Sequence, residues 1–212
     1  FDYSRNSRGV QCRMKPDRLT GFATEAANDP YRLDANGFPF DQTHHDAMAF
    51  LRENHAEPFF LYYATWLVHT PIVMRSEALL RKYEAKLGVT LTEAHKKNWK
   101  LEGQTNPFYC AMVEQLDYYM GNLFEYLETT DDPRWPGHKL VENTYIIFTS
   151  DNGGMESSGP NQIITDNYPL DRGKISAMEG GVRVPLIITG PGIHSGVQSD
   201  VMVNGLDFYP TI

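Results

Sequence analysis

The amino-acid sequence predicts an α/β fold in which a mainly parallel sheet is flanked by helices. Two kinds of segment alternate along residues 41–212: short runs of β-branched, aromatic and aliphatic residues, and longer segments with apolar residues every three to four positions. The short runs are typical of strands buried on both faces, and the longer segments are typical of amphipathic helices. Because ligands of open α/β sheets bind beyond the carboxyl ends of strands, polar residues that follow a strand are the first site candidates.

Three apolar runs are expected to be strands. Residues 59–64 read Phe-Phe-Leu-Tyr-Tyr-Ala, residues 144–150 read Thr-Tyr-Ile-Ile-Phe-Thr-Ser, and residues 184–189 read Val-Pro-Leu-Ile-Ile-Thr. The second run is followed by Asp-Asn-Gly-Gly and the third directly by Gly190, and these glycines allow the backbone to turn sharply.

Three polar residues, Asp41, Ser76 and Asn106, are each expected to cap the start of a helix. Gly88 is expected to end the second helix, and Pro107 suits the first position of the third. Apolar residues at helical spacing follow each cap, and we expect them to form buried stripes. These stripes are Ala47, Met48, Phe50 and Leu51; Leu79, Leu80, Tyr83 and Leu87; and Phe108, Met112, Leu116, Met120, Leu123 and Leu127.

Composition restricts the class of protein. At 212 residues the chain has the length of one ordinary domain, and its net charge of −8 argues against a nucleic-acid partner. No apolar run approaches the roughly 20 residues of a membrane span, and the first residues lack the features of a signal peptide. Residues 1–40 are punctuated by Gly and Pro and are expected to be irregular. Cys12 and Cys110 allow one disulfide without requiring it.

Four polar side chains are the candidates for chemistry. Asp151 and Asn152 follow the second strand, and a carboxylate beside an amide carbonyl is a ligand pair that Ca²⁺ accepts. Asp-Asn-Gly-Gly is also ordinary turn chemistry. His69 follows the first strand and Lys174 follows Gly173. Taken alone, a histidine is more often structural and a lysine is more often solvated. His44 and His45 lack partner ligands, so we expect both at the surface.

Several motifs together resemble the sulfatase family in content, order and spacing. The resemblance covers roughly residues 40–212, and its motifs are specific jointly rather than singly. The matching segments are Pro58–Ala64 with His69-Thr70-Pro71, Tyr109–Asp117, Ser150–Gly153, Thr165–Leu170, and Gly173-Lys174 with Glu179–Pro185.

The resemblance implies a partial alkaline-phosphatase-like three-layer sandwich. Residues 1–212 would form the central part of a single sulfatase catalytic domain, with sheet and helices over residues 41–212. We therefore expect the chain to be the middle of a larger protein that is periplasmic, secreted or lysosomal. Its substrate would be a small-molecule or carbohydrate sulfate ester. The oligomeric state stays open.

The resemblance also implies roles for the four candidates. Sulfatases use Ca²⁺ and a formylglycine nucleophile made in a Cys/Ser-x-Pro-x-Arg motif, which this sequence lacks, so formylglycine is expected outside this chain. Asp151 and Asn152 would be metal ligands in a site that this chain alone leaves incomplete. Lys174 and His69 would be catalytic and substrate-binding: Lys174 would hold a sulfate oxygen, and His69 would protonate the leaving group. Arg172 stands one position away from the family's arginine, so its role stays open.

Two other functions fit the same residues. A phosphate or phosphonate ester hydrolase of the same superfamily is one, although its two-zinc members place Asp-His where this chain has Asp151-Asn152. Losing that imidazole favours a single oxygen-ligated cation. A non-catalytic fragment or pseudoenzyme is the other. The nucleophile motif in the N-terminal part of the full-length protein would separate the three.

Overall fold

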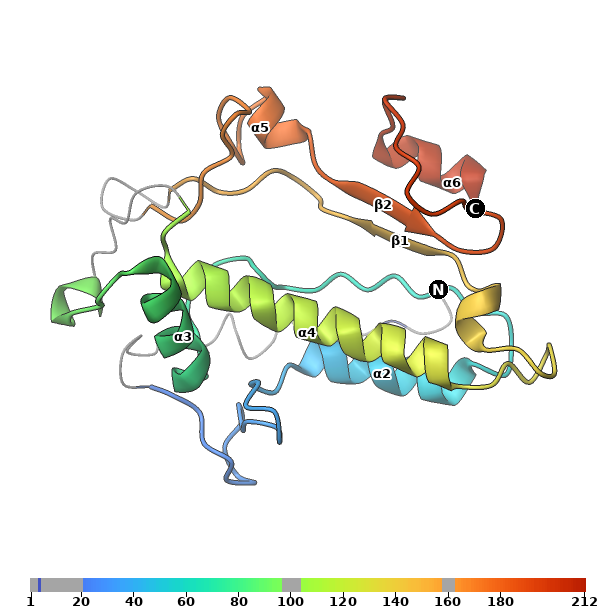
Figure 1. Ribbon diagram of the computed structural model, residues 1–212, viewed down its shortest axis with the longest axis horizontal. Helices are drawn as coiled ribbons and strands as arrows, with labels where there is room; N and C mark the ends of the chain where they lie inside the picture. Colours follow the sequence, from blue (N-terminus) through green and yellow to red (C-terminus); the bar gives the residue numbers. More distant parts are fainter. Residues whose placement is uncertain (1–3, 5–20, 97–103, 158–162) are drawn as a thin grey trace.

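A computed structural model of the chain describes residue 4 and residues 21–96, 104–157 and 163–212. Most of the segment 1–20, including Cys12, and the loop residues 158–162 lie outside the described residues. Figure 1 shows a layer of helices beneath a pair of strands. The main helices are α2 (Gln42–Asn54), α3 (Glu77–Leu87) and α4 (Pro107–Thr129), and the strands are β1 (Ile146–Thr149) and β2 (Leu186–Thr189). Short helices are α5 (Glu179–Val182) and α6 (Phe208–Thr211), with 3₁₀ turns at Glu93–Lys96, Leu140–Asn143 and Gly205–Asp207.

The three main helices begin at the predicted capping residues. The Asp41 carboxylate accepts a hydrogen bond from the His44 N–H at 2.8 Å, and Ser76 Oγ accepts one from the Leu79 N–H at 3.4 Å. The Asn106 side chain accepts from two N–H groups of the first turn of α4. Each cap satisfies backbone donors that the helix itself leaves unpaired. The predicted helix starts are therefore confirmed.

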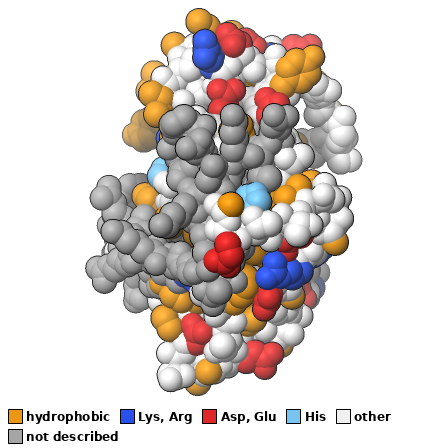
Figure 2. Space-filling view, turned by 90° about the vertical axis from the view of Figure 1, so that its left-hand side faces the viewer, with side chains coloured by type: hydrophobic (Ala, Val, Ile, Leu, Met, Phe, Trp, Pro, Cys, Tyr) orange, Lys and Arg blue, Asp and Glu red, His pale blue; other side chains and the backbone are white. Residues whose placement is uncertain are grey.

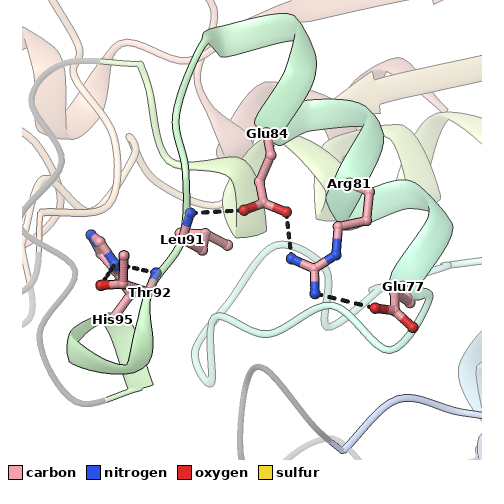
Figure 3. A network of polar contacts seen from close by, with 6 residues as sticks. All are labelled: Glu77, Arg81, Glu84, Leu91, Thr92 and His95. Atoms are coloured by element: carbon pink, nitrogen blue, oxygen red, sulfur yellow. Dashed lines mark hydrogen bonds and ion pairs between the residues drawn. The ribbon is translucent and has the colours of Figure 1, made fainter.

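The C-terminal end of α3 is closed by Gly88 and by a polar network. Gly88 adopts the left-handed conformation, with φ of 66°, as predicted for a helix-ending glycine. Figure 3 shows the Glu84 carboxylate between two donors: Arg81 Nη1 at 2.5 Å and the Leu91 N–H at 2.7 Å. Arg81 also donates to Glu77 at 3.1 Å. The network ties the chain after α3 back onto the helix.

The core lies mainly between α3 and α4. Leu80 and Phe108 are fully buried there, and Met112 is 1% exposed. The predicted stripe of α4 is only partly correct, because Leu116, Met120 and Leu123 are half-buried while Ala111, Gln115 and Tyr119 are buried. Buried polar groups on this face are paired: Gln115 Nε2 donates to the Tyr119 hydroxyl at 2.9 Å, and that hydroxyl donates to the Pro39 carbonyl. Hydrogen bonding lets this polar face point inward.

One of the two adjacent histidines departs from expectation. His45 is exposed as predicted, whereas the half-buried His44 ring stacks on Tyr119 at 4.3 Å. Burial lowers the pKa of His44 to about 4. The expectation that His44 is a surface residue was wrong, because the facing aromatic ring of α4 covers it.

The strands β1 and β2 form an antiparallel pair in which Ile146 lies opposite Thr189. Both lie within predicted strand segments, so these two predictions are confirmed. The prediction that they are buried on both faces was wrong: Phe148 is 38%, Ile187 59% and Ile188 40% exposed. The physical reason is that, in the described part of the chain, no helix packs extensively on either face of the β1–β2 pair.

Residues 59–64 are not assigned to a strand in the described structure, so this predicted strand is not observed there. Their exposure nevertheless alternates: Phe60 is 56% and Tyr62 75% exposed, and their neighbours are half-buried. In Figure 1 this segment and β1 run in the same direction, from right to left. The sole pairing observed among the described strands is antiparallel, so the mainly parallel sheet stays a prediction.

Three further features concern the N-terminal segment, the cysteine and the helix lengths. Residues 21–40 carry turns and an isolated bridge between Leu33 and Pro39, without a helix. Cys110 is a half-buried free thiol. No helix in the described ranges has the length and apolar character needed to cross a membrane.

Candidate active site

The loop after β1 lies against the loop before α5. The Gly153 N–H donates to the Gly181 carbonyl at 2.9 Å, and the Lys174 N–H donates to the Gly154 carbonyl at 2.9 Å. These backbone bonds bring Lys174 close to the turn that carries Asp151 and Asn152, although more than twenty residues separate them in sequence. Three of the four predicted site residues therefore belong to one cluster of loops.

Glycines make this close crossing possible. A Cβ atom on Gly153 would lie 1.7 Å from the Gly180 carbonyl oxygen, and one on Gly180 would lie 1.8 Å from the Arg172 carbonyl oxygen. No side chain can occupy such space, so the glycines are required for the contact between backbones. Gly153 thus does more here than allow the chain to turn.

The Asp151-Asn152 pair offers oxygen atoms for a cation. The Asp151 side chain is exposed, and no hydrogen bond or ion pair engages it among the described residues. Asn152 Nδ2 donates to the Gly153 carbonyl at 2.9 Å, which uses the amide nitrogen and leaves the amide oxygen as the available ligand. No group of three or more His, Cys, Asp or Glu side chains within the described ranges could hold a metal. The pair fits a hard cation by ligand type and supplies only part of its coordination.

Lys174 is the unpaired cation of its neighbourhood. Arg183 pairs with Glu179 at 2.9 Å, and Arg172 lies 3.9 Å from Asp171, whereas no ion pair involves Lys174 within the described structure. Figure 2 shows basic and acidic side chains next to one another at the upper end of the face that looks left in Figure 1. A half-buried, uncompensated ammonium is suited to hold an anion.

The backbone around Lys174 is strained. Arg172 has φ of 62° and Ile175 has φ of 78°, and a β-branched residue rarely adopts this conformation. The side chains of both residues point into solvent, since Arg172 and Ile175 are exposed. Such strain persists only where surrounding contacts enforce it, and it is typical of functional loops.

His69 is exposed in the turn that follows the extended segment, where its N–H donates to the Trp66 carbonyl at 2.9 Å. Its Nδ1 lies 3.0 Å from the Thr70 carbonyl oxygen and 3.2 Å from Thr70 Oγ1. Because a carbonyl only accepts, Nδ1 carries the hydrogen and Nε2 is the nitrogen open to a ligand. The Trp66 ring lies 4.9 Å from the imidazole. No hydrogen bond in the described ranges joins His69 to the other three candidates.

Asn167 belongs to this loop cluster and was not assigned a role from the sequence. Its Nδ2 donates to the Gly154 carbonyl at 2.9 Å, and its Oδ1 accepts from the Gly154 N–H at 3.2 Å. The signal that could have identified it is its place within the Thr165–Leu170 motif, which carries the resemblance but has no obvious chemistry.

A separate open hollow of ≈ 330 Å³ lies between α2 and α4. It contains none of the four predicted site residues and lies on the helical side of the molecule. Its lining residues are His44, Met48, Arg52, Asn122, Glu125, Tyr126 and Thr129.

Comparison with known proteins identifies the family. The sulfatase family profile matches residues 3–212, so the chain belongs to the sulfatase family. A protein named sulfatase from Formosa agariphila is 40% identical over 160 residues, which cover 73% of this chain and 25% of that protein. Human arylsulfatase H is 27% identical, over 79% of this chain and 25% of that protein, and mouse N-acetylgalactosamine-6-sulfatase is 28% identical, over 78% and 26%. No solved structure matches.

Family membership carries the α/β fold class with it. It also confirms that the sequence motifs identify a sulfatase. The chain spans about a quarter of the length of these curated relatives.

Proposed function

We propose that the full-length protein hydrolyses sulfate monoesters and that this chain supplies part of its active site. The observation that carries the proposal is the hydrogen bond from the Lys174 N–H to the Gly154 carbonyl. It holds the Lys174 backbone against the loop that carries Asp151 and Asn152, which supports a shared site for these residues in a chain of the sulfatase family. Hydrolysis of a sulfate ester uses both a cation and an oxygen-ligand pair, because the non-bridging oxygens carry negative charge and further charge develops on the leaving-group oxygen as its bond to sulfur breaks.

Asp151 and Asn152 are the proposed ligands for Ca²⁺. Their oxygens are the donor types that this cation accepts, and neither is used by a hydrogen bond in the described structure. Ca²⁺ takes about six to eight oxygens, so further ligands come from other parts of the full-length protein. When bound, the cation would stabilise negative charge on the sulfate oxygens.

Lys174 and His69 are the proposed catalytic residues. Lys174 holds a sulfate oxygen through its ammonium group. As an imidazolium with Nδ1–H directed at the Thr70 carbonyl, His69 presents Nε2–H to the ester oxygen. It donates that proton to the leaving group and is left as the neutral imidazole with its hydrogen on Nδ1. The nucleophile, a formylglycine in this proposal, lies outside this chain.

The proposal includes a mainly parallel sheet and a substrate class. The extended segment 59–64 runs in the direction of β1 and its side-chain exposure alternates, which supports a strand parallel to β1. An antiparallel edge strand such as β2 is common on such sheets.

The names of the relatives support a small-molecule or carbohydrate sulfate ester as substrate. A periplasmic, secreted or lysosomal location goes with this proposal.

The proposal is tested with the full-length protein on nitrophenyl sulfate and nitrophenyl phosphate. Lys174→Ala is expected to lower kcat/KM for the sulfate about 10²- to 10³-fold, because a cation aimed at developing charge is lost. Arg172→Ala is the matched control, since its guanidinium is exposed and paired with Asp171. Equal rates for both variants and the wild type would remove Lys174 from the site. A preference for the phosphate would favour a phosphate ester hydrolase.

His69→Ala separates proton donation from binding. We expect kcat/KM to fall more for an alkyl or sugar sulfate than for nitrophenyl sulfate, because nitrophenolate leaves readily without a proton. The measurement is kcat/KM on both substrates, with the melting temperature as a control for folding. The role of His69 is refuted if both substrates lose the same factor.

A further inference from the structure

The Asn167 side chain binds both backbone groups of one residue. Its amide donates to the Gly154 carbonyl at 2.9 Å and accepts from the Gly154 N–H at 3.2 Å. The orientation of the amide is set by these bonds, because the carbonyl requires a donor and the N–H requires an acceptor. Asn167 therefore satisfies both the N–H and the carbonyl of Gly154, as the backbone of a paired strand does, and holds Gly154 in one conformation.

Gly154 also connects the two halves of the site. Its carbonyl accepts a second hydrogen bond from the Lys174 N–H at 2.9 Å. A Cβ atom on Gly173 would lie 2.5 Å from Asn167 Nδ2 and 2.3 Å from the Gly154 oxygen. The Asn167 amide, the Gly154 peptide and the Gly173 backbone thus meet in a contact that leaves no room for a side chain.

The segment that carries Asn167 is anchored to the helical layer. Thr165 Oγ1 donates to Gln104 Oε1 at 2.7 Å, and Gln104 Nε2 donates to the Asp166 carbonyl. Asn106, the cap of α4, donates to the Ile163 carbonyl at 3.1 Å. These hydrogen bonds connect the start of α4 to the segment that carries Asn167, and Asn167 connects that segment to Gly154.

We propose that Asn167 is a positioning residue that fixes the Asp151-Asn152 pair relative to Lys174 through its two hydrogen bonds to Gly154. The inference rests on the proposed function, since it gives these three residues their roles. Asn167 itself touches neither substrate nor metal. Its contribution is to keep ligand oxygens and ammonium at the separation that one sulfate group requires. Groups that orient ligands in this way typically change metal affinity or activity 10–100-fold when they are mutated.

The test uses Asn167→Ala in the full-length protein with Ca²⁺ alone as the probe. The Ca²⁺ concentration that gives half of the rise in melting temperature should increase about 10- to 100-fold. Hydrogen exchange should accelerate in peptides that contain residues 151–154 and 173–175, and kcat should fall more than KM changes. Asn167→Asp keeps the acceptor for the Gly154 N–H but sets a carboxylate oxygen against the Gly154 carbonyl, so it should not restore the wild-type midpoint.

Asn143→Ala is the control, because it removes one side-chain hydrogen bond, to Asp132, away from the site loops. It should leave the Ca²⁺ midpoint and the exchange of residues 151–154 unchanged. If Asn167→Ala leaves both the hydrogen exchange of these peptides and the Ca²⁺ midpoint unchanged, the inference is overturned. The proposed function would still stand if the wild type hydrolyses sulfate esters. A wild type without sulfate ester hydrolysis and without Ca²⁺ dependence would overturn both. Equal acceleration of exchange over the whole protein would show a general loss of stability and would also overturn the inference.

Discussion

The helical layer and the strand-and-loop region (residues 144–157 and 163–212) are held together by different interactions. In the helical layer, large side chains such as Leu80 and Phe108 are fully buried between helices. In the strand-and-loop region, large apolar side chains such as Phe148 and Ile187 remain 38% and 59% exposed. Its loops are joined by backbone hydrogen bonds across glycines, such as the one from Gly153 to Gly181.

The difference shows where stability and chemistry lie in this chain. Buried apolar surface stabilises the helical layer, and much of that stabilisation is independent of the exact path of the loops. The candidate site depends on loop geometry, which small changes of backbone position disturb. The two regions meet at the start of α4, where Gln104 and Asn106 bind the segment 163–166. Substitutions in the two regions should therefore have separable effects.

Truncation of Phe108 should have the largest effect on stability. Phe108→Ala removes a fully buried ring from the contact between α3 and α4 and is expected to cost about 3–5 kcal/mol. Chemical denaturation of the full-length protein measures the loss, and kcat/KM per folded molecule should change little. Val113→Ala on the same helix is the control, because Val113 is 44% exposed. A similar loss from both variants would contradict a core centred on α3 and α4.

The same substitution of glycine by alanine should have opposite signs in the two regions. Gly180→Ala places a Cβ atom 1.8 Å from the Arg172 carbonyl oxygen and should cost about 1–3 kcal/mol, with loss of activity. Gly121→Ala, in α4, meets nothing within 4 Å and should stabilise the protein by about 0.5–1 kcal/mol. Melting temperature and kcat/KM report both effects. If Gly121→Ala lowers the melting temperature, or if Gly180→Ala leaves melting temperature and activity unchanged, the predicted difference between the two regions is contradicted.

Acid should destabilise the helical layer through His44. Burial lowers the pKa of His44 to about 4 in the folded protein, below the ordinary value of 6.5. The unfolded chain therefore binds the proton first as the pH falls, so the free energy of unfolding decreases between pH 6.5 and about 4. One proton contributes at most about 1.4 kcal/mol per pH unit, and less here because the ring is partly exposed.

Urea unfolding from pH 7 to pH 4.5 measures this dependence in the wild type, His44→Phe and His45→Gln. The His44→Phe variant should lose part of the acid sensitivity, because its ring keeps the contact with Tyr119 without binding a proton. His45→Gln is the comparison variant, because His45 is exposed and lies next to His44 in α2. An unchanged slope in His44→Phe would assign the acid sensitivity to other groups.

The sequence by itself determined the features that depend on near neighbours. Asp41, Ser76 and Asn106 cap helices because each side chain reaches an N–H two or three residues ahead, and such contacts form without knowledge of the fold. Gly88 ends α3 because glycine adopts the left-handed conformation without a steric penalty. The motifs around Asp151 and Lys174 identified the family before any contact was known.

Only the tertiary structure decided which distant groups meet. Apolar spacing placed Leu116 and Met120 in the core, but hydrogen bonding allowed Gln115 and Tyr119 to be the buried residues of α4. Asn167 holds Gly154 across thirteen positions of sequence, a pairing that local pattern does not specify. Exposure of β1 and β2 likewise depends on which elements cover them, since the same apolar run suits a buried or an exposed strand. Contacts of this kind depend on how packed elements approach one another, and residue spacing along the chain does not encode that approach.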